Sequence, residues 1–467
     1  MKKIFLLITT LLFLNSCIKD DLDYNTGSTS ENYTELVGDL TTRTLTKDKK
    51  YLIKGQVFVK DGQVLTIEPG TVIFGDKASK GTLIISLGGK IIANGTATQP
   101  IVFTSAQKTE SRDRGDWGGI VILGKAPVNQ TNAVIEGISP PVVYGGTINN
   151  DNSGILKYVR VEYAGIELSP NNETNSITMG GVGNGTTMEY CQVSYGGDDG
   201  FEWFGGTING KNLIAFGMWD DCFDIDFGWS GNLQHLLSVR YASFADQSGS
   251  NIIETDSGPS DNPVPFLTNG VITNLTAIGP KLANTTAINA GNYQHAIDMR
   301  RRTALTIANS VFVGMPRGLR MNQQTVFNNY TNNEGVLLNN ILHCPVASAP
   351  NVPFAVGSGM TATATTVQNY WNANGNTTLS NTTGAVSFDD YATLGLNTNV
   401  FYGTNTLNFY PSNPNFEVTA GTLTSGASFA NPKLTNAYFT ATTYRGAFGT
   451  TDWTNGWAEF VPNLKAY

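Results

Sequence analysis

Two similar stretches, offset by 22 residues, constrain the fold of this 467-residue chain more than any other feature. They read GGDDGFEWFGG at 196–206 and WDDCFDIDFGW at 219–229. Superposition aligns an Asp-Asp pair, a phenylalanine and an acidic residue of each copy, namely Asp198, Asp199, Phe201 and Glu202 on Asp220, Asp221, Phe223 and Asp224. Within each copy apolar and acidic residues alternate, so one set faces a core and the other a surface. A unit this short is not an independent domain, and the repeat predicts stacked coils of a solenoid.

The acidic position of this motif recurs further along the chain. Successive positions are 22, 30, 44 and 22 residues apart and share a local frame: Glu202, Asp224, Glu254, Asp298 and Arg320. With their neighbours pointing inward, these residues form one outward column. A second column, two residues on, contains Asp226, Asp256, Arg300 and Asn322. We expect the acidic members of both columns to face a ligand: Glu202, Asp224, Asp226, Glu254, Asp256 and Asp298.

Other repeats extend the pattern. Residues 65–73 match residues 83–91 with an offset of 18. Alternating strands also recur at 159–163, 191–195 and 237–241. Short strands repeated at such spacing are typical of a parallel β-helix, in which each coil stacks on the next.

The fold class follows from these repeats. We predict an all-β chain with a parallel β-helix over residues 51–345. Beyond this point Asn, Thr and Ser become frequent and strands are hard to register. Because an open stack of strands is an aggregation template, residues 346–467 are expected to form a C-terminal β/loop cap with loops along the side.

Composition excludes several classes of function. The formal charge is −8, and without a basic stripe the chain is not expected to bind nucleic acid. Its three histidines are widely spaced, which argues against a His-based zinc site and against a Ser-His-Asp triad. Cys191, Cys222 and Cys344 are expected to be buried and unpaired.

The first residues predict export. Residues 1–16 combine a basic start with a short apolar run and small residues before Cys17, and this pattern resembles a bacterial lipoprotein signal. The alternative is an ordinary secretory signal with an incidental cysteine. Lys19, Asp20 and Asp21 resemble the surface-export signal of Bacteroidetes lipoproteins. We therefore expect lipid on Cys17, a flexible tether over residues 17–50, and a protein at the outer face of the outer membrane.

Longer segments resemble a known superfamily. Residues 62–75, 88–105 and 116–128 are similar to the opening coils of right-handed parallel β-helix proteins of the pectin-lyase-like superfamily. Residues 194–206 and 442–457 resemble a group of Bacteroidetes surface lipoproteins. The resemblance implies a right-handed β-helix and a surface location, and it leaves the function to be argued from the site.

The paired aspartates predict a calcium site. Asp198, Asp199, Asp220 and Asp221 occupy equivalent positions on adjacent coils, about 4.8 Å apart along the stack. Carboxylate oxygens are the ligands that Ca²⁺ prefers, and without a cation so many like charges repel one another. The alternative is that these aspartates only hydrogen-bond to the backbone of turns.

Three functions remain open. The first is a surface protein that binds a glycan or another polymer. The resemblance to Bacteroidetes surface lipoproteins implies a TonB-dependent transporter as its partner. The second is a Ca²⁺-dependent polysaccharide lyase with Arg300 or Arg320 as its base, although a salt-bridged ladder with Asp256 and Asp298 is the favoured explanation of both arginines. Polygalacturonase-like hydrolysis is disfavoured, since the Gly-His-Gly and Arg-Ile-Lys motifs are absent. The third is a structural or adhesive lipoprotein.

Overall fold

The computed structural model describes residues 32–169, 172–281, 288, 292–344, 352–379, 388–401 and 410–467. Residues 1–31, which include the predicted signal peptide, Cys17 and the acidic export signal, lie outside the described residues. None of the described helices is long and apolar enough to cross a membrane.

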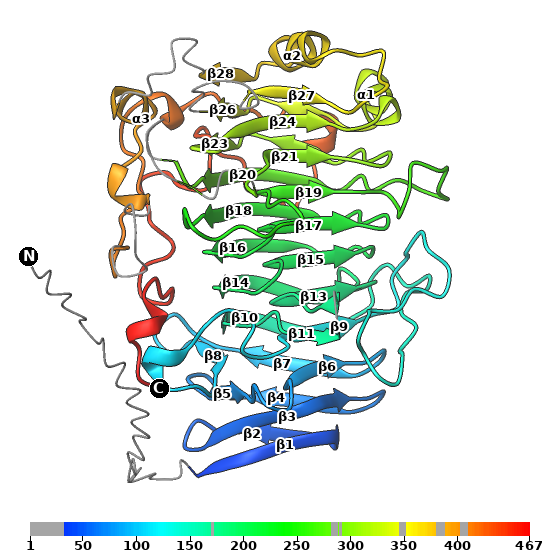
Figure 1. Ribbon diagram of the computed structural model, residues 1–467, viewed down its shortest axis with the longest axis vertical. Helices are drawn as coiled ribbons and strands as arrows, with labels where there is room; N and C mark the ends of the chain where they lie inside the picture. Colours follow the sequence, from blue (N-terminus) through cyan, green and yellow to red (C-terminus); the bar gives the residue numbers. More distant parts are fainter. Residues whose placement is uncertain are drawn as a thin grey trace, which may run out of the picture. The chain divides into compact units, whose positions relative to one another are not determined.

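Parallel strands stack coil upon coil along one axis, as Figure 1 shows. Face A carries the acidic repeat and consists of the end of β3 (Lys50–Val59), then β6 (Thr82–Ile85), β9 (Ile120–Leu123), β13 (Ile177–Gly180), β15 (Phe201–Phe204), β17 (Phe223–Asp226), β19 (Ile253–Thr255), β21 (His295–Met299), β24 (Arg317–Met321) and β27 (Phe354–Val356). The chain is therefore a right-handed parallel β-helix, as predicted.

Two further faces complete each coil. Face B consists of β2 (Arg43–Leu45), β4 (Val64–Ile67), β7 (Lys90–Asn94), the first halves of five long strands, β22 (Thr306–Ala308) and β25 (Leu337–Leu338). Face C consists of β5 (Val72–Gly75), β8 (Ile101–Ser105), the second halves of the same strands, β23 (Val311–Val313), β26 (Ile341–His343) and β28 (Thr377–Leu379). The five long strands are β10 (Gly154–Glu162), β14 (Thr187–Ser194), β16 (Gly210–Phe216), β18 (Asn232–Val239) and β20 (Val271–Ile278).

The remaining elements begin or flank the three faces. β1 (Tyr33–Leu40) pairs in parallel with both halves of β3 and so begins faces C and A. β11 (Glu167–Ser169) and β12 (Asn172–Glu173) form a separate antiparallel pair. The helices are α1 (Gln324–Thr331), α2 (Ala364–Ala373) and α3 (Phe388–Leu394).

Like residues stack on like residues inside the solenoid. Phe201 lies on Phe223 with ring centroids 5.8 Å apart and planes 12° from parallel, and both side chains are fully buried. Trp203 and Ile225, two residues further along the same strands, repeat this arrangement. Burial of such side chains is worth roughly 1.5–3 kcal/mol each, so a continuous core runs through the stacked coils.

A column of left-handed residues forms the corner between faces B and C. Tyr190, Asn212, His235, Asn274 and Asn309 occupy this column with φ of 53°, 59°, 59°, 57° and 52°. A single left-handed residue bends a strand sharply without a loop. Tyr158, with φ of 49°, precedes them in the column, and because asparagine tolerates this region better than tyrosine does, the two tyrosines are strained exceptions.

The strand register confirms the main column and corrects two repeats. Glu202, Asp224, Glu254, Asp298 and Arg320 are consecutive partners across face A, as predicted. The offset of 18 was wrong, because Leu65 pairs with Ile91 and Leu83 with Val57. Successive faces of one coil have similar sequences, and the alignment had matched faces instead of coils.

Two other expectations also fail. In the strand at 237–241, Leu236 and not Leu237 is aligned with Leu213 and hence with Cys191. A slip of one residue reverses every side chain, and Leu237 therefore points outward. The tether over residues 17–50 was predicted too long, since β1, β2 and the start of β3 already form the first coil from Tyr33 onward.

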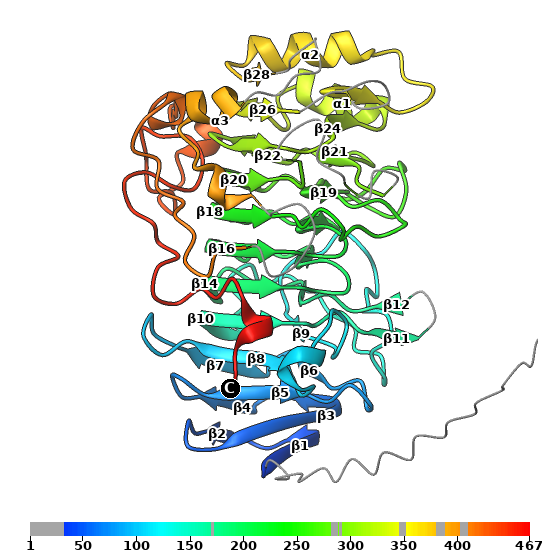
Figure 2. The same ribbon diagram turned by 60° about the vertical axis from the view of Figure 1, so that its left-hand side comes forward.

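The residues expected as a cap divide into two parts. β27, β28 and α2 follow residue 345, and Trp371 of α2 packs against Phe354 at the end of the stack. Residues 410–467, which we call the strap, run back along the stacked coils, as the orange-to-red segment in Figure 2 shows. The Lys50 ammonium donates a hydrogen bond of 2.7 Å to the carbonyl of Tyr467, so the end of the strap reaches the first coils.

The strap covers apolar residues that point outward from face C. Phe216, Leu237 and Val239 are buried in one cluster with strap residues Phe448 and Phe460. Outward positions of an alternating strand are usually polar because they face solvent. They are apolar here because a second layer of chain covers them.

Candidate metal centre

The outward side of face A changes character along the solenoid axis. Its central column begins with the apolar residues Phe58, Ile84 and Val121. Thr178 follows, and the column then becomes acidic at Glu202, Asp224, Glu254 and Asp298 before it ends in Arg320 and Ala355.

A long excursion between β9 and β10, residues 124–153, covers much of this face. The amide of Gly206 donates a hydrogen bond of 2.8 Å to the Pro127 carbonyl, and the amide of Asn129 donates one of 3.0 Å to the Phe227 carbonyl. Tyr144 is buried in a cluster with Ile84 and Val121. The acidic residues are buried as a result: Glu202, Asp224 and Asp226 are each 8% exposed.

The C-terminal half of the acidic surface, on β19, β21 and the turns that follow them, has arginines as counter-charges. Arg300 contacts Asp256 through Nε–Oδ1 and Nη2–Oδ2 distances of 3.2 and 2.6 Å, and it also pairs with Glu254. Arg301 lies 2.7 Å from Asp256, and Arg320 donates to Asp298 across 2.7 Å. Both predicted catalytic arginines are therefore held in the ion pairs that the alternative interpretation described.

The N-terminal half, on β15, β17 and the turns before them, forms no such ion pairs within the described part of the chain. Seven carboxylates of this part of the face and of the turns before its strands form no ion pair with a described lysine, arginine or histidine: Asp198, Asp199, Glu202, Asp220, Asp221, Asp224 and Asp226. We call this set the acidic cluster. Burial, reinforced by neighbouring carboxylates, holds the pKa of Asp199, Glu202 and Asp224 well above the ordinary range. Burial and then the charge of Asp220 raise the pKa of Asp221 to about 8.

Part of the cluster has a structural role. Asp199 Oδ1 accepts a hydrogen bond of 2.8 Å from the amide of Asp221, and Asp221 Oδ1 accepts one from the amide of Asn251. Asn251 continues the ladder by accepting from the amide of His295 across 2.8 Å. These aspartates do bind backbone amides, although the amides belong to the next coil and not to their own turn.

Two sets of ligand atoms lie close enough to share an ion. Asp198, Asp199 and Asp220 form one set, and Asp199, Glu202 and Asp224 form the other, with the ligand oxygens of each set within 4.8 Å of one another. Three of the four aspartates predicted to bind calcium are thus brought together, whereas Asp221 belongs to neither set.

Several buried oxygen atoms in this region lack a hydrogen-bond partner within the described part of the chain. They are Oδ1 of Asp224, Oδ1 of Asp226, the hydroxyl of Tyr144 and Oδ1 of Asn175. An unsatisfied buried oxygen costs roughly 1–3 kcal/mol, so several together indicate a missing partner. Because every donor atom here is a hard oxygen, the residues fit Ca²⁺ or a similar cation.

Sequence reasoning missed two residues of the site. Asn175 donates to Glu202 Oε2, and it precedes β13 by two residues, as Asp199 precedes β15. The repeat frame would have found it. Tyr144 lies in the excursion, where no periodic pattern exists to place a side chain, and no signal in the sequence could have found it.

Comparison with known proteins supports the same architecture. A family model described as the pectate-lyase-like beta helix domain matches residues 38–395, which include the acidic cluster and both predicted arginines. No curated protein and no solved structure matches the chain at a significant level. Since the matched residues form most of the chain and the strands stack as that family requires, the protein belongs to the pectate-lyase-like beta-helix family.

Proposed function

We propose that this protein binds Ca²⁺ in the acidic cluster and that the ion enables it to bind an acidic polymer, a glycan above all. The observation that carries the proposal is the contrast along a single column of face A. Where Glu254 and Asp298 point outward, arginines neutralise them. One coil before Glu254, Asp224 is also largely buried, at 8% exposed, and forms no ion pair with any described arginine.

A buried carboxylate must be paired or protonated, because removing its charge from water uncompensated costs several kcal/mol. An ion shared by Asp199, Glu202 and Asp224 would compensate all three. Asp198 and Asp220 are more accessible than these three, and they mark the side from which a ligand carboxylate would approach. With a formal charge of −8 the protein repels anionic polymers, and a bound cation would supply the local attraction.

The same contacts favour binding over cleavage. A lyase needs a base that is free to take a proton from its substrate. Arg300 is engaged by Asp256 and Glu254, and Arg320 by Asp298. We therefore propose a binding protein rather than a lyase.

The proposed location rests on sequence alone. Lipid on Cys17 and the Lys19, Asp20 and Asp21 signal would place the β-helix outside the outer membrane. A TonB-dependent transporter that imports the captured glycan is the partner we propose there.

The first prediction concerns calcium and stability. Ca²⁺ should raise the thermal midpoint by a few degrees relative to EDTA, because a ligand at roughly one hundred times its Kd adds about 2.7 kcal/mol to the folded state. Asp224→Asn should abolish this shift and leave the EDTA midpoint unchanged or higher, since a repelling charge is removed. Asp298→Asn is the matched control from the same column: it should lower the EDTA midpoint by leaving Arg320 unpaired, yet keep the calcium shift. An equal calcium shift in wild type and Asp224→Asn would contradict the site.

The second prediction concerns pH. The pKa of Asp221 rises from 3.8 to about 8 on folding. The folded protein therefore binds more protons than the unfolded chain between these values, and its stability should fall as the pH rises from about 4 to about 8. Ca²⁺ favours the ionised carboxylates and should remove most of this decline. Thermal melts across that range, in EDTA and in Ca²⁺, measure the effect, and an EDTA midpoint that increases with pH would be the opposite of what we expect.

The third prediction concerns the polymer. Immobilised polygalacturonate and alginate should retain the wild-type protein in Ca²⁺ and release it in EDTA, whereas neutral dextran should not retain it. Asp198→Asn/Asp220→Asn should weaken retention, because these carboxylates lie on the accessible side. The absorbance of unsaturated sugars should stay constant during incubation. A steady rise in absorbance would indicate a lyase, and no retention on either acidic polymer would leave a structural or adhesive protein.

The fourth prediction concerns the anchor. Cys17→Ser should move the protein from the membrane fraction to the soluble fraction and abolish labelling with radioactive palmitate. Replacing Lys19, Asp20 and Asp21 with alanine should keep the label but protect the protein from protease added to intact cells. Equal degradation of this triple variant and the wild type would show that the export signal had been misassigned.

A further inference from the structure

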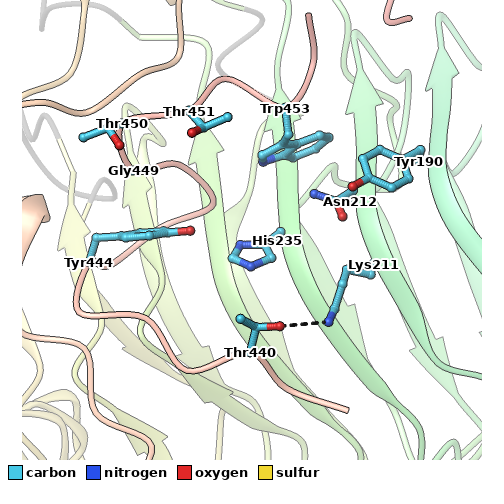
Figure 3. Close-up of a pocket in the computed structure, with 10 residues that line it drawn as sticks. All are labelled: Tyr190, Lys211, Asn212, His235, Thr440, Tyr444, Gly449, Thr450, Thr451 and Trp453. Carbon is cyan, nitrogen blue, oxygen red and sulfur yellow. Dashed lines mark hydrogen bonds between the residues drawn. The ribbon is translucent and has the colours of Figure 1, made fainter. Parts of the chain in front are cut away.

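A pocket of about 340 Å³ lies at the corner between faces B and C, remote in the fold from the acidic face A. Figure 3 shows the six side chains that matter most to its chemistry: Tyr190, Lys211, Asn212, His235, Tyr444 and Trp453. Its volume is at the lower end of the range for small-ligand sites, about 300–1,000 Å³, and admits a single ring.

The pocket exists because a stack of rings is interrupted. Tyr158 and Tyr190 stack along the corner column with centroids 4.5 Å apart. Asn212 is the next member of the column, and His235 follows it. Two coils separate Tyr190 from His235, which is about 9.6 Å, and the short asparagine side chain leaves a ring-sized space between them.

The strap walls this space on two sides. Gln234 exchanges hydrogen bonds of 2.7 and 2.9 Å with the backbone of Thr440, and Asn274 donates to the carbonyls of Tyr444 and Gly446 across 3.2 and 3.1 Å. The strap then turns back past Trp453 and pairs with Gln192 at Glu459. The chain is fixed before and after the pocket, so its walls are held in place.

The polar groups of the pocket are incompletely used. Asn274 and Asn309 both bind the strap, whereas the side chain of Asn212 makes no hydrogen bond within the described part of the chain, although it is only 6% exposed. His235 Nδ1 is buried without a partner, and burial lowers the pKa of this ring to about 4, so that it is neutral at physiological pH. Hydroxyls of Thr440, Thr450 and Thr451 add further donors and acceptors.

Lys211 is the one lysine or arginine among the residues that line the pocket, and burial lowers the pKa of its ammonium group. Its ammonium donates to the Tyr438 carbonyl at 2.9 Å and to Thr440 Oγ1 at 3.4 Å, the contact drawn in Figure 3. Glu189, its partner in the strand register, instead pairs with Lys157. Within the described part of the chain Lys211 thus forms no ion pair of its own, although Glu189 lies on the preceding coil, and it brings a positive charge to the pocket of a protein that is acidic overall.

We propose that this pocket binds one sugar ring that carries a single anionic group, a carboxylate or a sulfate. The ring occupies the space between Tyr190 and His235, its hydroxyls meet Asn212, His235 Nδ1 and the threonines, and its anionic group meets Lys211. This inference does not depend on the cation site of face A.

The test uses the full chain in EDTA, so that failure of the calcium proposal cannot affect it. Isothermal titration with glucuronate, glucose 6-sulfate and uncharged glucose should give saturable 1:1 binding of at least one anionic sugar, with glucose weaker by about tenfold or more. Lys211→Gln should remove the preference for the charged sugar. Lys90→Gln, which changes a lysine of β7 on face B that does not line the pocket, should change nothing.

Asn212→Tyr fills the space with the residue that the column already holds at Tyr158 and Tyr190, both left-handed. It should abolish binding while the protein stays folded, with a thermal midpoint lowered by a few degrees at most, because tyrosine tolerates the left-handed conformation less well than asparagine. If this variant does not fold, Thr451→Trp fills the pocket from an exposed position on the strap and should have the same effect. The inference fails if none of the three sugars binds, if glucose binds as tightly as the anionic sugars, or if a folded filled variant still binds.

Discussion

Each side chain of this solenoid lies about 4.8 Å from its counterpart on the next coil, and the rest of the structure depends on this stacking. Apolar rings gain from it, as Phe201 on Phe223 does. Amide side chains gain as well, because Asn251 bonds the backbone of the following coil. Like charges do not gain, so an acidic column must be neutralised by arginine, by protons or by a metal ion.

Face A shows neutralisation by arginine in one part and carboxylates without an arginine ion pair, the proposed cation site, in the other. In its C-terminal half Arg300 and Arg320 neutralise the carboxylates, since Asp256 and Asp298 are fully buried and form ion pairs with them. One and two coils before Glu254, Asp224 and Glu202 are buried under the excursion and form no ion pair with a described arginine. The strap adds a second layer along face C, and where it turns away from Asn212 it leaves a pocket of a different character. The two sites are thus consequences of one periodic scaffold interrupted in two ways.

Much of this could be predicted from the sequence, because period-two alternation and a constant coil length are direct consequences of stacking. The β-helix, the central column and the partnership of Asp198, Asp199 and Asp220 followed from one repeat. The rest could not be predicted where the period is lost. An excursion contributes Tyr144, a one-residue difference in coil length turns Leu237 outward, and the strap bonds Asn274 across a separation of about 170 residues. The offset of 18 was assigned wrongly because successive faces have similar sequences. A local pattern alone does not identify which face a strand belongs to.

The central claim is that the acidic cluster is neutralised by a cation, and a crystal structure grown in Ca²⁺ tests it most directly. The anomalous signal should show a peak about 2.3–2.6 Å from oxygens of Asp199, Glu202 and Asp224 or of Asp198, Asp199 and Asp220. The claim would be contradicted if no anomalous peak lay near the carboxylates at millimolar Ca²⁺ and they hydrogen-bonded to one another instead. The cluster would then be neutralised by protonation.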